Sequence, residues 1–346
     1  MNKQLFPPEP KYPKVNYIGN KEKIASWICD QFPSDVKTIA DVFCGGCSLA
    51  YEAKKRGYRV IVNDILSINY QIGLALIENN HEILTDDDVA HIFSVSGSRK
   101  NTKGFMSQYY ANQFFFSDEC EQLDAYRENI ITLTNPYKQA LAFSLMRRAM
   151  IRKMPYSRFT INWEKIKQLR DEEYSYAKYG RKRAYHNESF ENHFLQNLSA
   201  YNQAVFDNGE QHHAFNEDVF DLLTHIQADA VYLDPPYTGT MNNYFGFYGL
   251  LDNYVKSSVS QPFANHFMDK KQAVELFERL ICSLKPFKYW LLSYNNVSHP
   301  NRDQLAEMLG RNGRAVKILE TPHVYKVTGK ENKQNHKEIL FLVENI

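Results

Sequence analysis

The tetrapeptide Asp234-Pro235-Pro236-Tyr237 combines residue types that suit one particular chemistry. The two prolines fix the backbone and remove two N–H donors, so the turn presents acceptors only. The Asp234 carboxylate and the Pro235 carbonyl can accept both hydrogens of an amino group on a planar heterocycle, while Tyr237 stacks on the ring. These contacts stabilise the positive charge that develops when the nitrogen attacks an electrophile. We therefore expect all four residues to be catalytic.

A second candidate site runs from Asp41 to Ser48 and has the sequence DVFCGGCS. Glycines after a buried strand let the backbone approach a ligand closely, and the following helix offers its N-terminus. The G-x-G-x-x-G of a dinucleotide site is missing; instead Asp41 precedes the loop and Asp64 ends the next apolar run. The first acid suits a cationic ligand and the second suits ribose hydroxyls. S-adenosylmethionine offers both features, although on this motif alone a generic βαβ turn is an equally good interpretation.

The Cys44-Gly45-Gly46-Cys47 spacing also allows a redox pair or half of a zinc site. The chain contains no second C-x-x-C, and small side chains are what a tight loop tolerates, so we expect no metal. The five cysteines are odd in number and scattered over a long chain, which does not suggest a disulfide framework.

Short apolar runs predict the strands that position these residues. Thr38–Phe43 and Arg59–Asn63 flank a helical stretch at Leu49–Arg56, which Gly57 closes, and together they form one βαβ unit of a parallel, doubly wound sheet. The strand pattern resumes at three later runs that are short and apolar, as expected of strands covered on both faces: Ala230–Asp234, Lys288–Ser293 and Glu338–Glu344.

Between Ser67 and Asn197 the strand pattern stops, and the sequence becomes polar, helical in pattern and rich in Tyr, Lys and Arg. The fold class that we expect is α/β, with a Rossmann-like, mostly parallel sheet interrupted by a largely helical insertion. Residues 1–68 and 198–346 would form a discontinuous catalytic domain, and residues 69–197 would form the inserted domain.

Bulk composition excludes some classes of protein. The chain is 43% hydrophobic and 23% charged, and no run approaches the 18 apolar residues of a membrane span. The segment Met1–Tyr12 is polar and proline-rich, without the apolar stretch of a signal peptide, so we expect a cytoplasmic protein.

The net charge of +1 conceals a strong asymmetry along the chain. Residues 138–187 contain thirteen basic and four acidic residues, a net of +9, so the rest of the chain carries about −8. Such segregation is typical of a partner with a phosphate backbone, although each basic pair alone could be a solvated face. The nucleic-acid contacts that we expect are Arg147, Arg148, Arg152, Lys153, Arg158, Arg181, Lys182 and Arg183.

Taken with these motifs, the chain resembles the adenine-specific (N6) DNA methyltransferases of the DNA adenine methylase type, in which the cofactor motifs precede the D-P-P-Y. Three further segments match that family in order: Tyr17 to Lys21 (YIGNK), Asn216 to Phe220 (NEDVF) and Tyr289 to Asn295. The resemblance covers roughly 15–68 and 217 to the C-terminus. Cys47 departs from it, because many relatives carry a third glycine there.

The resemblance implies that S-adenosylmethionine is the cofactor, that double-stranded DNA is the partner, and that residues 69–197 recognise the target. The first matching segment would lie along the methionine end of the cofactor, the second would contact its adenine, and the third would wall the target-base pocket. The cofactor contacts that we expect are Tyr17, Gly19, Lys21, Asp41, Phe43, Cys44, Gly45, Gly46, Asp64, Ile65, Asp218 and Val219. We also expect a monomer or weak dimer, which acts either alone or beside a restriction endonuclease that shares its site.

An adenine amino group is buried in the duplex stack, so the enzyme would swing the nucleotide into its pocket before methylation. Two alternatives share this active-site logic: methylation of adenine in RNA, and methylation of the N4 amino group of cytosine in DNA. The cytosine pattern more often has Ser in place of Asp234, and a protein-glutamine methyltransferase more often has Asn there. A non-catalytic nucleic-acid-binding protein on a degenerate scaffold is disfavoured because Asp41, Asp64 and the D-P-P-Y are all present.

Overall fold

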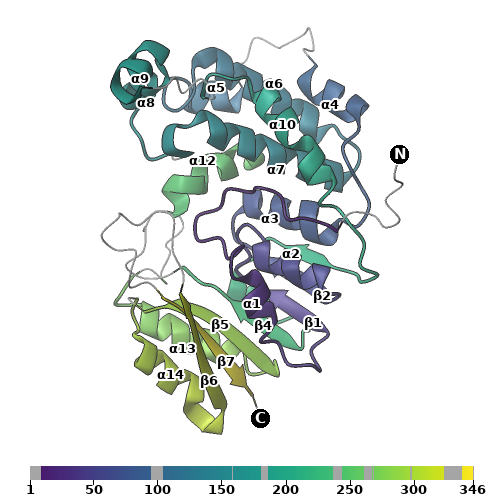
Figure 1. Cartoon of the computed structure of the whole chain (residues 1–346), viewed down its shortest axis with the longest axis vertical. Helices are drawn as coiled ribbons and strands as arrows, with labels where there is room; N and C mark the ends of the chain where they lie inside the picture. Colours follow the sequence, from purple (N-terminus) through teal and green to yellow (C-terminus); the bar gives the residue numbers. More distant parts are fainter. Residues whose placement is uncertain are drawn as a thin grey trace.

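The computed structural model contains a seven-stranded sheet, which combines two strands from residues 38–63 with five strands from residues 213–344 (Figure 1). The structure describes residues 9–94, 104–157, 159–180, 186–236, 244–260, 267, 269–296, 298–322 and 337–345. The strands lie in the order β3-β2-β1-β4-β5-β7-β6. Their bounds are β1 (Thr38–Asp41), β2 (Arg59–Asn63), β3 (His213–Phe215), β4 (Ala230–Leu233), β5 (Tyr289–Asn295), β6 (Ala315–Pro322) and β7 (Lys337–Glu344). Strand β7 runs antiparallel to β5 and β6, and the other pairs are parallel.

The α/β, mostly parallel architecture expected from the sequence is confirmed, with five strands at or within two residues of their predicted bounds. The sequence analysis missed β3 and β6, which are the two edge strands. Strand β3 is only three residues long, and no residue of β6 is fully buried. Neither edge strand has the continuous apolar run on which the other strands were recognised.

Helices cover both faces of the sheet because successive strand residues point to opposite sides. On β1, Ile39 belongs to one hydrophobic cluster and its neighbour Ala40 to the other. The first cluster includes residues of α1 (Ala25–Cys29) and α2 (Ser48–Lys55). The second cluster includes residues of α11 (Val219–Leu222), α13 (Ala273–Ser283) and α14 (Arg302–Gly310).

A helical layer lies between β2 and β3 in the chain and stacks on one side of the sheet in Figure 1. Its helices are α3 (Ser67–Gly73), the π-helix η1 (Leu74–Glu78), α4 (Asp86–Phe93), α5 (Phe105–Tyr109), α6 (Ser117–Ile131), α7 (Pro136–Lys153), α8 (Trp163–Arg170), α9 (Glu172–Tyr179) and α10 (Phe190–Asn202). Helix α12 (Tyr244–Lys256), which follows β4, packs against α3. No helix in the described part of the chain is long and apolar enough to cross a membrane.

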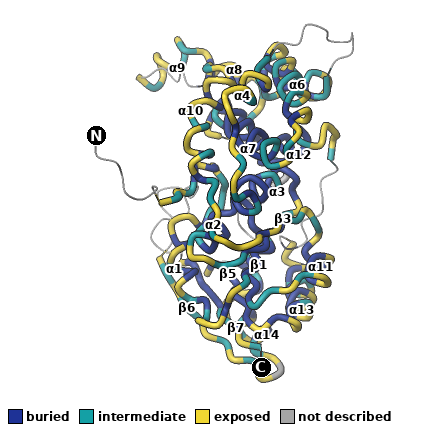
Figure 2. Tube along the Cα trace, turned by 90° about the vertical axis from the view of Figure 1, so that its right-hand side faces the viewer, coloured by how far each residue is buried: buried dark blue, intermediate teal, exposed yellow. Residues whose placement is uncertain are grey.

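Helix α7 is the centre of the helical layer. Asn135 caps it by accepting hydrogen bonds from the backbone N–H groups of Tyr137 and Lys138, and Pro136 occupies its first turn. Thirteen of its 18 residues are buried, and Figure 2 shows the helix buried together with α3 and β1. Residues of α7 and of the sheet belong to one hydrophobic cluster, so the two layers share a core.

The predicted DNA contacts Arg147, Arg148 and Lys153 require correction, because all three side chains are buried in this layer. Arg147 donates to the carbonyl of Val15, and Arg148 donates to the side-chain oxygen of Asn197. A side chain that is buried and bonded inside the protein cannot reach a phosphate without rearrangement. Four of the thirteen basic residues counted in the sequence are therefore buried: Arg147, Arg148, Lys153 and Arg170.

Lys153 belongs to a buried ionic network around Glu119, a residue near the start of α6. The Lys153 ammonium lies 2.8 Å from Glu119 Oε1, and the Arg170 guanidinium spans both carboxylate oxygens at 2.6 and 2.8 Å. All three side chains are at most 8% exposed. One carboxylate thus pairs with two buried cations and ties α6, α7 and α8 together.

We predict that Glu119→Gln lowers the free energy of unfolding by about 3 kcal/mol or more, because Lys153 and Arg170 stay buried without a counter-charge. Urea titration followed by circular dichroism measures the change. Glu121→Gln, at an exposed position of the same helix, should alter stability by less than about 0.5 kcal/mol. Equal free energies of unfolding for the two variants would show that the Glu119 network does not contribute as predicted.

Candidate active site at the carboxyl edge of the sheet

Three acidic side chains lie at the carboxyl ends of neighbouring parallel strands. Asp41 ends β1, Asp64 follows β2 and Asp234 follows β4, and β1 pairs with both other strands. The backbone N–H of Val42 also donates to the Tyr232 carbonyl, which keeps the ends of β1 and β4 together. The structure therefore brings together the two acidic motifs that the sequence analysis singled out.

Lys21 joins the N-terminal segment to this edge. Its buried ammonium group lies 2.7 Å from Asp234 Oδ2 and 3.4 Å from Glu338 Oε1, and it also donates to the Gly19 carbonyl at 3.4 Å. Glu338, which is fully buried, was missed as a site residue by the sequence analysis. It is placed here because β7 is antiparallel, so the start of β7 lies opposite Asn295 at the end of β5.

The charge at this edge is unbalanced in favour of the carboxylates. Burial, and then the charges of Asp234 and Asp64, raise the pKa of Asp41 well above its usual range. Asp41 Oδ1 is buried and accepts no hydrogen bond from any residue that the structure describes. A buried acceptor of this kind needs a donor or a positive charge. In S-adenosylmethionine, the ammonium group would supply the hydrogen-bond donor that this acceptor needs, and the sulfonium group would add positive charge.

Asp64 is held by the glycine loop on one side and by its own turn on the other. Its Oδ2 accepts from the Gly45 N–H at 3.0 Å, and its Oδ1 accepts from the Leu66 N–H at 2.8 Å. Burial raises the pKa of Asp64 to about 6, although these hydrogen bonds partly offset it. The neighbouring Ile65 side chain is 44% exposed.

The loop from Cys44 to Cys47 needs small residues for a steric reason. Gly45 has φ +49°, and a Cβ added there would lie 2.5 Å from the Tyr17 ring, while one on Gly46 would lie 2.9 Å from Tyr17 Cβ. Cys47 adopts φ +61° in spite of its side chain, so the left-handed turn forms without the third glycine of the family pattern. Burial raises the pKa of both Cys44 and Cys47, which disfavours a reactive thiolate.

The predicted segment from Asn216 to Val219 lies beside Asp64. Asn216 Nδ2 donates to the Asp64 carbonyl at 2.7 Å, and Glu217 exchanges hydrogen bonds with the side chain of Asn63. Asp218 is exposed and caps α11 through the Phe220 N–H, whereas Val219 is buried. The segment is therefore fixed at the end of β2, next to the acid that we expect to bind ribose.

The remaining predicted residues divide between described and undescribed positions. Pro235 is buried, Pro236 is partly buried, and Phe43 packs edge-on against Phe267 with ring centroids 5.8 Å apart. In β5, Tyr294 is buried and donates to the Pro300 carbonyl at 2.8 Å. Arg152 is partly exposed. Five predicted residues lie outside the described part of the chain: Tyr237, Arg158, Arg181, Lys182 and Arg183.

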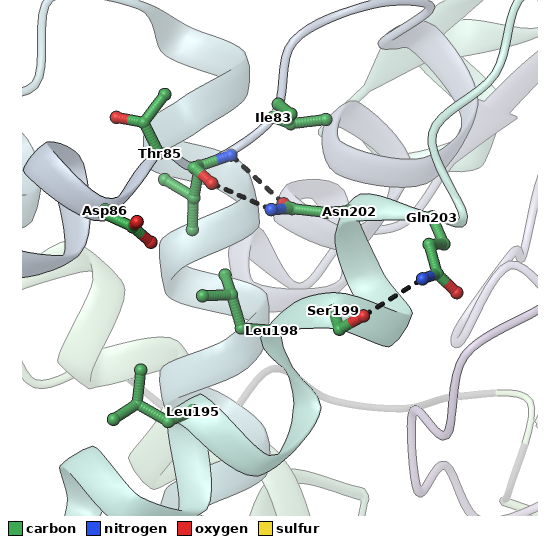
Figure 3. Close-up of a pocket in the computed structure, with 9 residues that line it drawn as sticks. Ile83, Thr85, Asp86, Leu195, Leu198, Ser199, Asn202 and Gln203 are labelled. Carbon is green, nitrogen blue, oxygen red and sulfur yellow. Dashed lines mark hydrogen bonds between the residues drawn. The ribbon is translucent and has the colours of Figure 1, made fainter.

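Two further findings concern other kinds of site. Among the described residues, no group of three or more His, Cys, Asp or Glu side chains is arranged to hold a metal ion. A surface hollow lies between Ile83 and Leu195 (Figure 3), where Asn202 exchanges hydrogen bonds with the Leu84 backbone. The acidic edge, formed by Asp41, Asp64, Asp234 and Glu338, contributes no residue to the lining of this hollow.

Comparison with known proteins identifies the family. The model of the D12 class of N6 adenine-specific DNA methyltransferases matches residues 17–308, which include the glycine loop, both strand-end acids and the D-P-P-Y. The chain belongs to the D12 class. It is therefore an adenine-specific DNA methyltransferase that transfers a methyl group from S-adenosylmethionine to the N6 amino group of adenine. This membership decides between the alternatives left open above and confirms the family resemblance.

Curated relatives support the same family over nearly the whole chain. The chain is 74% identical to the Type II methyltransferase M2.HphI of Haemophilus parahaemolyticus, over 97% of this chain and 99% of the relative. It is 23% identical to the Type II methyltransferase M.NlaIII of Neisseria lactamica, over 93% and 96% of the two chains. It is also 24% identical to the Type II methyltransferase M.FokI of Planomicrobium okeanokoites, over 94% of this chain and 50% of the relative.

We predict that Asp64→Asn gains stability relative to the wild-type D12 enzyme as the pH rises from 5 to 7.5 in the absence of ligand. A carboxyl group whose pKa is raised to about 6 on folding lowers stability as the pH rises through that value, because the folded protein must then hold a buried charge. The amide removes this cost at every pH, although its NH2 group then faces one of the two backbone N–H donors. The difference in melting temperature, variant minus wild type, should therefore rise by about 2 °C or more over this pH range.

The gain should shrink on going from pH 7.5 to pH 5, where Asp64 is protonated in the folded protein. Differential scanning fluorimetry at both pH values measures it, and Asp87→Asn, at an exposed acid of α4, serves as the control. A gain of the same size at both pH values would show that Asp64 ionisation is not its cause.

Proposed function

We propose that Asp234 and the Pro235 carbonyl hold the amino group of a flipped-out adenine, with S-adenosylmethionine bound between the glycine loop, Asp41 and Asp64. The observation that carries this proposal is the position of Asp234: it follows the central strand β4, beside the edge at which Asp41 and Asp64 end the next two strands. Substrate amine and cofactor would then meet at one point of the sheet.

In this proposal the acidic edge recognises the cofactor by charge and by shape. When bound, S-adenosylmethionine supplies an electrophilic methyl group on a positively charged sulfur. Asp41 would accept from its ammonium group and Asp64 from its ribose hydroxyls, while Ile65 and the Asp218–Val219 turn would face its adenine. The Cys44 to Gly46 loop would lie along it, together with Phe43. Tyr17, Gly19 and Lys21 would flank the methionine end.

The same proposal assigns the chemistry at the adenine to Asp234. Its carboxylate and the Pro235 carbonyl would accept the two N6 hydrogens, which directs the nitrogen lone pair toward the methyl group. Lys21 holds Asp234 Oδ2 at 2.7 Å and so fixes the orientation of the carboxylate. As the N–C bond forms and the methyl–sulfur bond breaks, positive charge develops on N6, and the negative carboxylate stabilises it until the methylated amine releases a proton to solvent. Pro236 would stiffen the turn and Tyr237 would stack on the base.

We also propose that the helical residues 69–197 recognise the target, while residues 1–68 and 198–346 carry catalysis. Among the basic residues predicted to contact DNA, Arg152, Arg158, Arg181, Lys182 and Arg183 remain candidates. The relatives' names as Type II methyltransferases support a role beside a restriction endonuclease that cuts the same double-stranded site. A monomer or weak dimer in the cytoplasm stays part of this proposal.

We predict that Asp234→Ala lowers methyl transfer by at least about a hundredfold, because the developing charge on N6 loses its stabilising carboxylate. Transfer of a radiolabelled methyl group to duplex DNA measures the rate, and isothermal titration with S-adenosylmethionine should still detect binding. Asp234→Asn, which keeps the shape but not the charge, should also be impaired. Wild-type turnover in Asp234→Ala would refute the assignment.

The target sequence follows from a second experiment. DNA from cells that express the wild-type protein should carry N6-methyladenine in one sequence context, as read by methylation-sensitive single-molecule sequencing. Cells that express Asp234→Ala are the control and should lack the mark. Methylcytosine in place of methyladenine would contradict the proposed pocket.

A further inference from the structure

Arg147, in the middle of α7, contacts a segment more than 120 residues earlier in the chain. Its guanidinium donates to the Val15 carbonyl at 2.5 Å and to the Asn16 carbonyl at 3.5 Å. The side chain is fully buried, and no carboxylate among the described residues lies within ion-pair distance of it. The positively charged guanidinium therefore bonds backbone carbonyls, and these bonds fix the N-terminal segment to the helical layer.

The segment that Arg147 holds leads directly into the cofactor site. Asn16 has φ +56°, a left-handed turn after which the chain places Tyr17 over the glycine loop. The side chains on either side of this turn pack tightly: Val15 is 1% exposed, and a Cβ on Gly45 would lie 2.5 Å from the Tyr17 ring. A shift of the turn would therefore move Tyr17 relative to the loop that it covers.

Helix α12 completes the support through Tyr248. The Tyr248 ring stacks on Tyr17 with centroids 5.0 Å apart and an interplanar angle of 7°, and its hydroxyl accepts from the Ile18 N–H at 2.8 Å. The Arg147 guanidinium carbon lies 5.4 Å from the centroid of the same ring. Arg147, Tyr248 and Tyr17 thus form a continuous contact from α7 through α12 to the glycine loop.

We propose that Arg147 is a positioning residue for the cofactor site, which acts through Tyr248 and the 15–18 segment, and not a contact to DNA. The inference rests on the proposed binding of S-adenosylmethionine over the glycine loop. It assigns to the helical layer a second task beside target recognition: it holds the N-terminal wall of the cofactor site. The planar guanidinium suits this task because it can bond two carbonyls and lie against a ring, which an ammonium group cannot do equally well.

The matched control is the neighbouring Arg148. It is also buried in α7, but it bonds Asn197 of α10 and so stays within the helical layer. Arg147→Lys and Arg148→Lys keep the charge and remove the guanidinium at adjacent positions of one helix. A general weakening of α7 should affect both variants, whereas loss of the N-terminal anchor should affect only Arg147→Lys.

We predict that Arg147→Lys raises the KM for S-adenosylmethionine on the order of tenfold, as expected for loss of hydrogen bonds from a charged donor. The affinity for duplex DNA and its dependence on salt should not change. Arg148→Lys should leave the KM for S-adenosylmethionine at the wild-type value. Steady-state kinetics with each substrate varied in turn, and fluorescence anisotropy with labelled DNA over a range of salt concentrations, measure these quantities.

A second variant keeps the test decisive if Arg147→Lys folds poorly. Tyr248→Phe removes the acceptor for the Ile18 N–H but keeps the ring stack, so it should raise the KM for S-adenosylmethionine several-fold, with DNA affinity unchanged.

Two results would overturn the inference. The first is weaker DNA binding by Arg147→Lys with unchanged cofactor KM and a salt slope reduced by about one, which would indicate a phosphate contact. The second is an equal rise in cofactor KM for Arg147→Lys and Arg148→Lys, which would indicate general destabilisation. Failure of the proposed function would give other results: the wild-type enzyme would not bind S-adenosylmethionine, or Asp234→Ala would remain active.

Discussion

At the carboxyl edge of the sheet, the ammonium group of Lys21 lies among carboxylates that the fold has largely removed from water. Asp234 and Glu338 contact it directly, and burial, followed by the charges of Asp234 and Asp64, raises the pKa of Asp41. Holding like charges close together costs free energy, which the hydrophobic clusters on the two faces of the sheet must offset. A ligand that brings positive charge to this edge relieves the repulsion, so binding and stability are coupled there.

The position of each charge depends on the direction of its strand. Parallel strands put Asp41, Asp64 and Asp234 at one edge because each acid ends its strand. Glu338 reaches the same edge from the opposite direction, at the start of the antiparallel strand β7. The single reversed strand therefore adds a fourth acid to the three that the parallel strands supply.

The same reasoning shows what can be predicted from the sequence and what cannot. Strand ends can be located from apolar runs, so the three acids that follow such runs could be placed at one edge in advance. The position of Glu338 could not be predicted, because its apolar run does not tell whether the strand is parallel or antiparallel. Arg147 could not, because a charge count treats every arginine as exposed, and only the packing of α7 against residues 15–16 shows where it lies. The β3 and β6 edge strands lack a continuous apolar run altogether.

The shared core of the two layers limits how the helical layer can change during evolution. Residues of α3 and α7 pack in one hydrophobic cluster with β1 and β2, so the helical layer is not a separable module. Exchange of the whole segment with that of a relative would mismatch this shared core and the contact of Arg147 with the N-terminal segment. If this layer recognises the target, as proposed above, new recognition sequences are expected to arise by substitution at its periphery rather than by exchange of the complete layer.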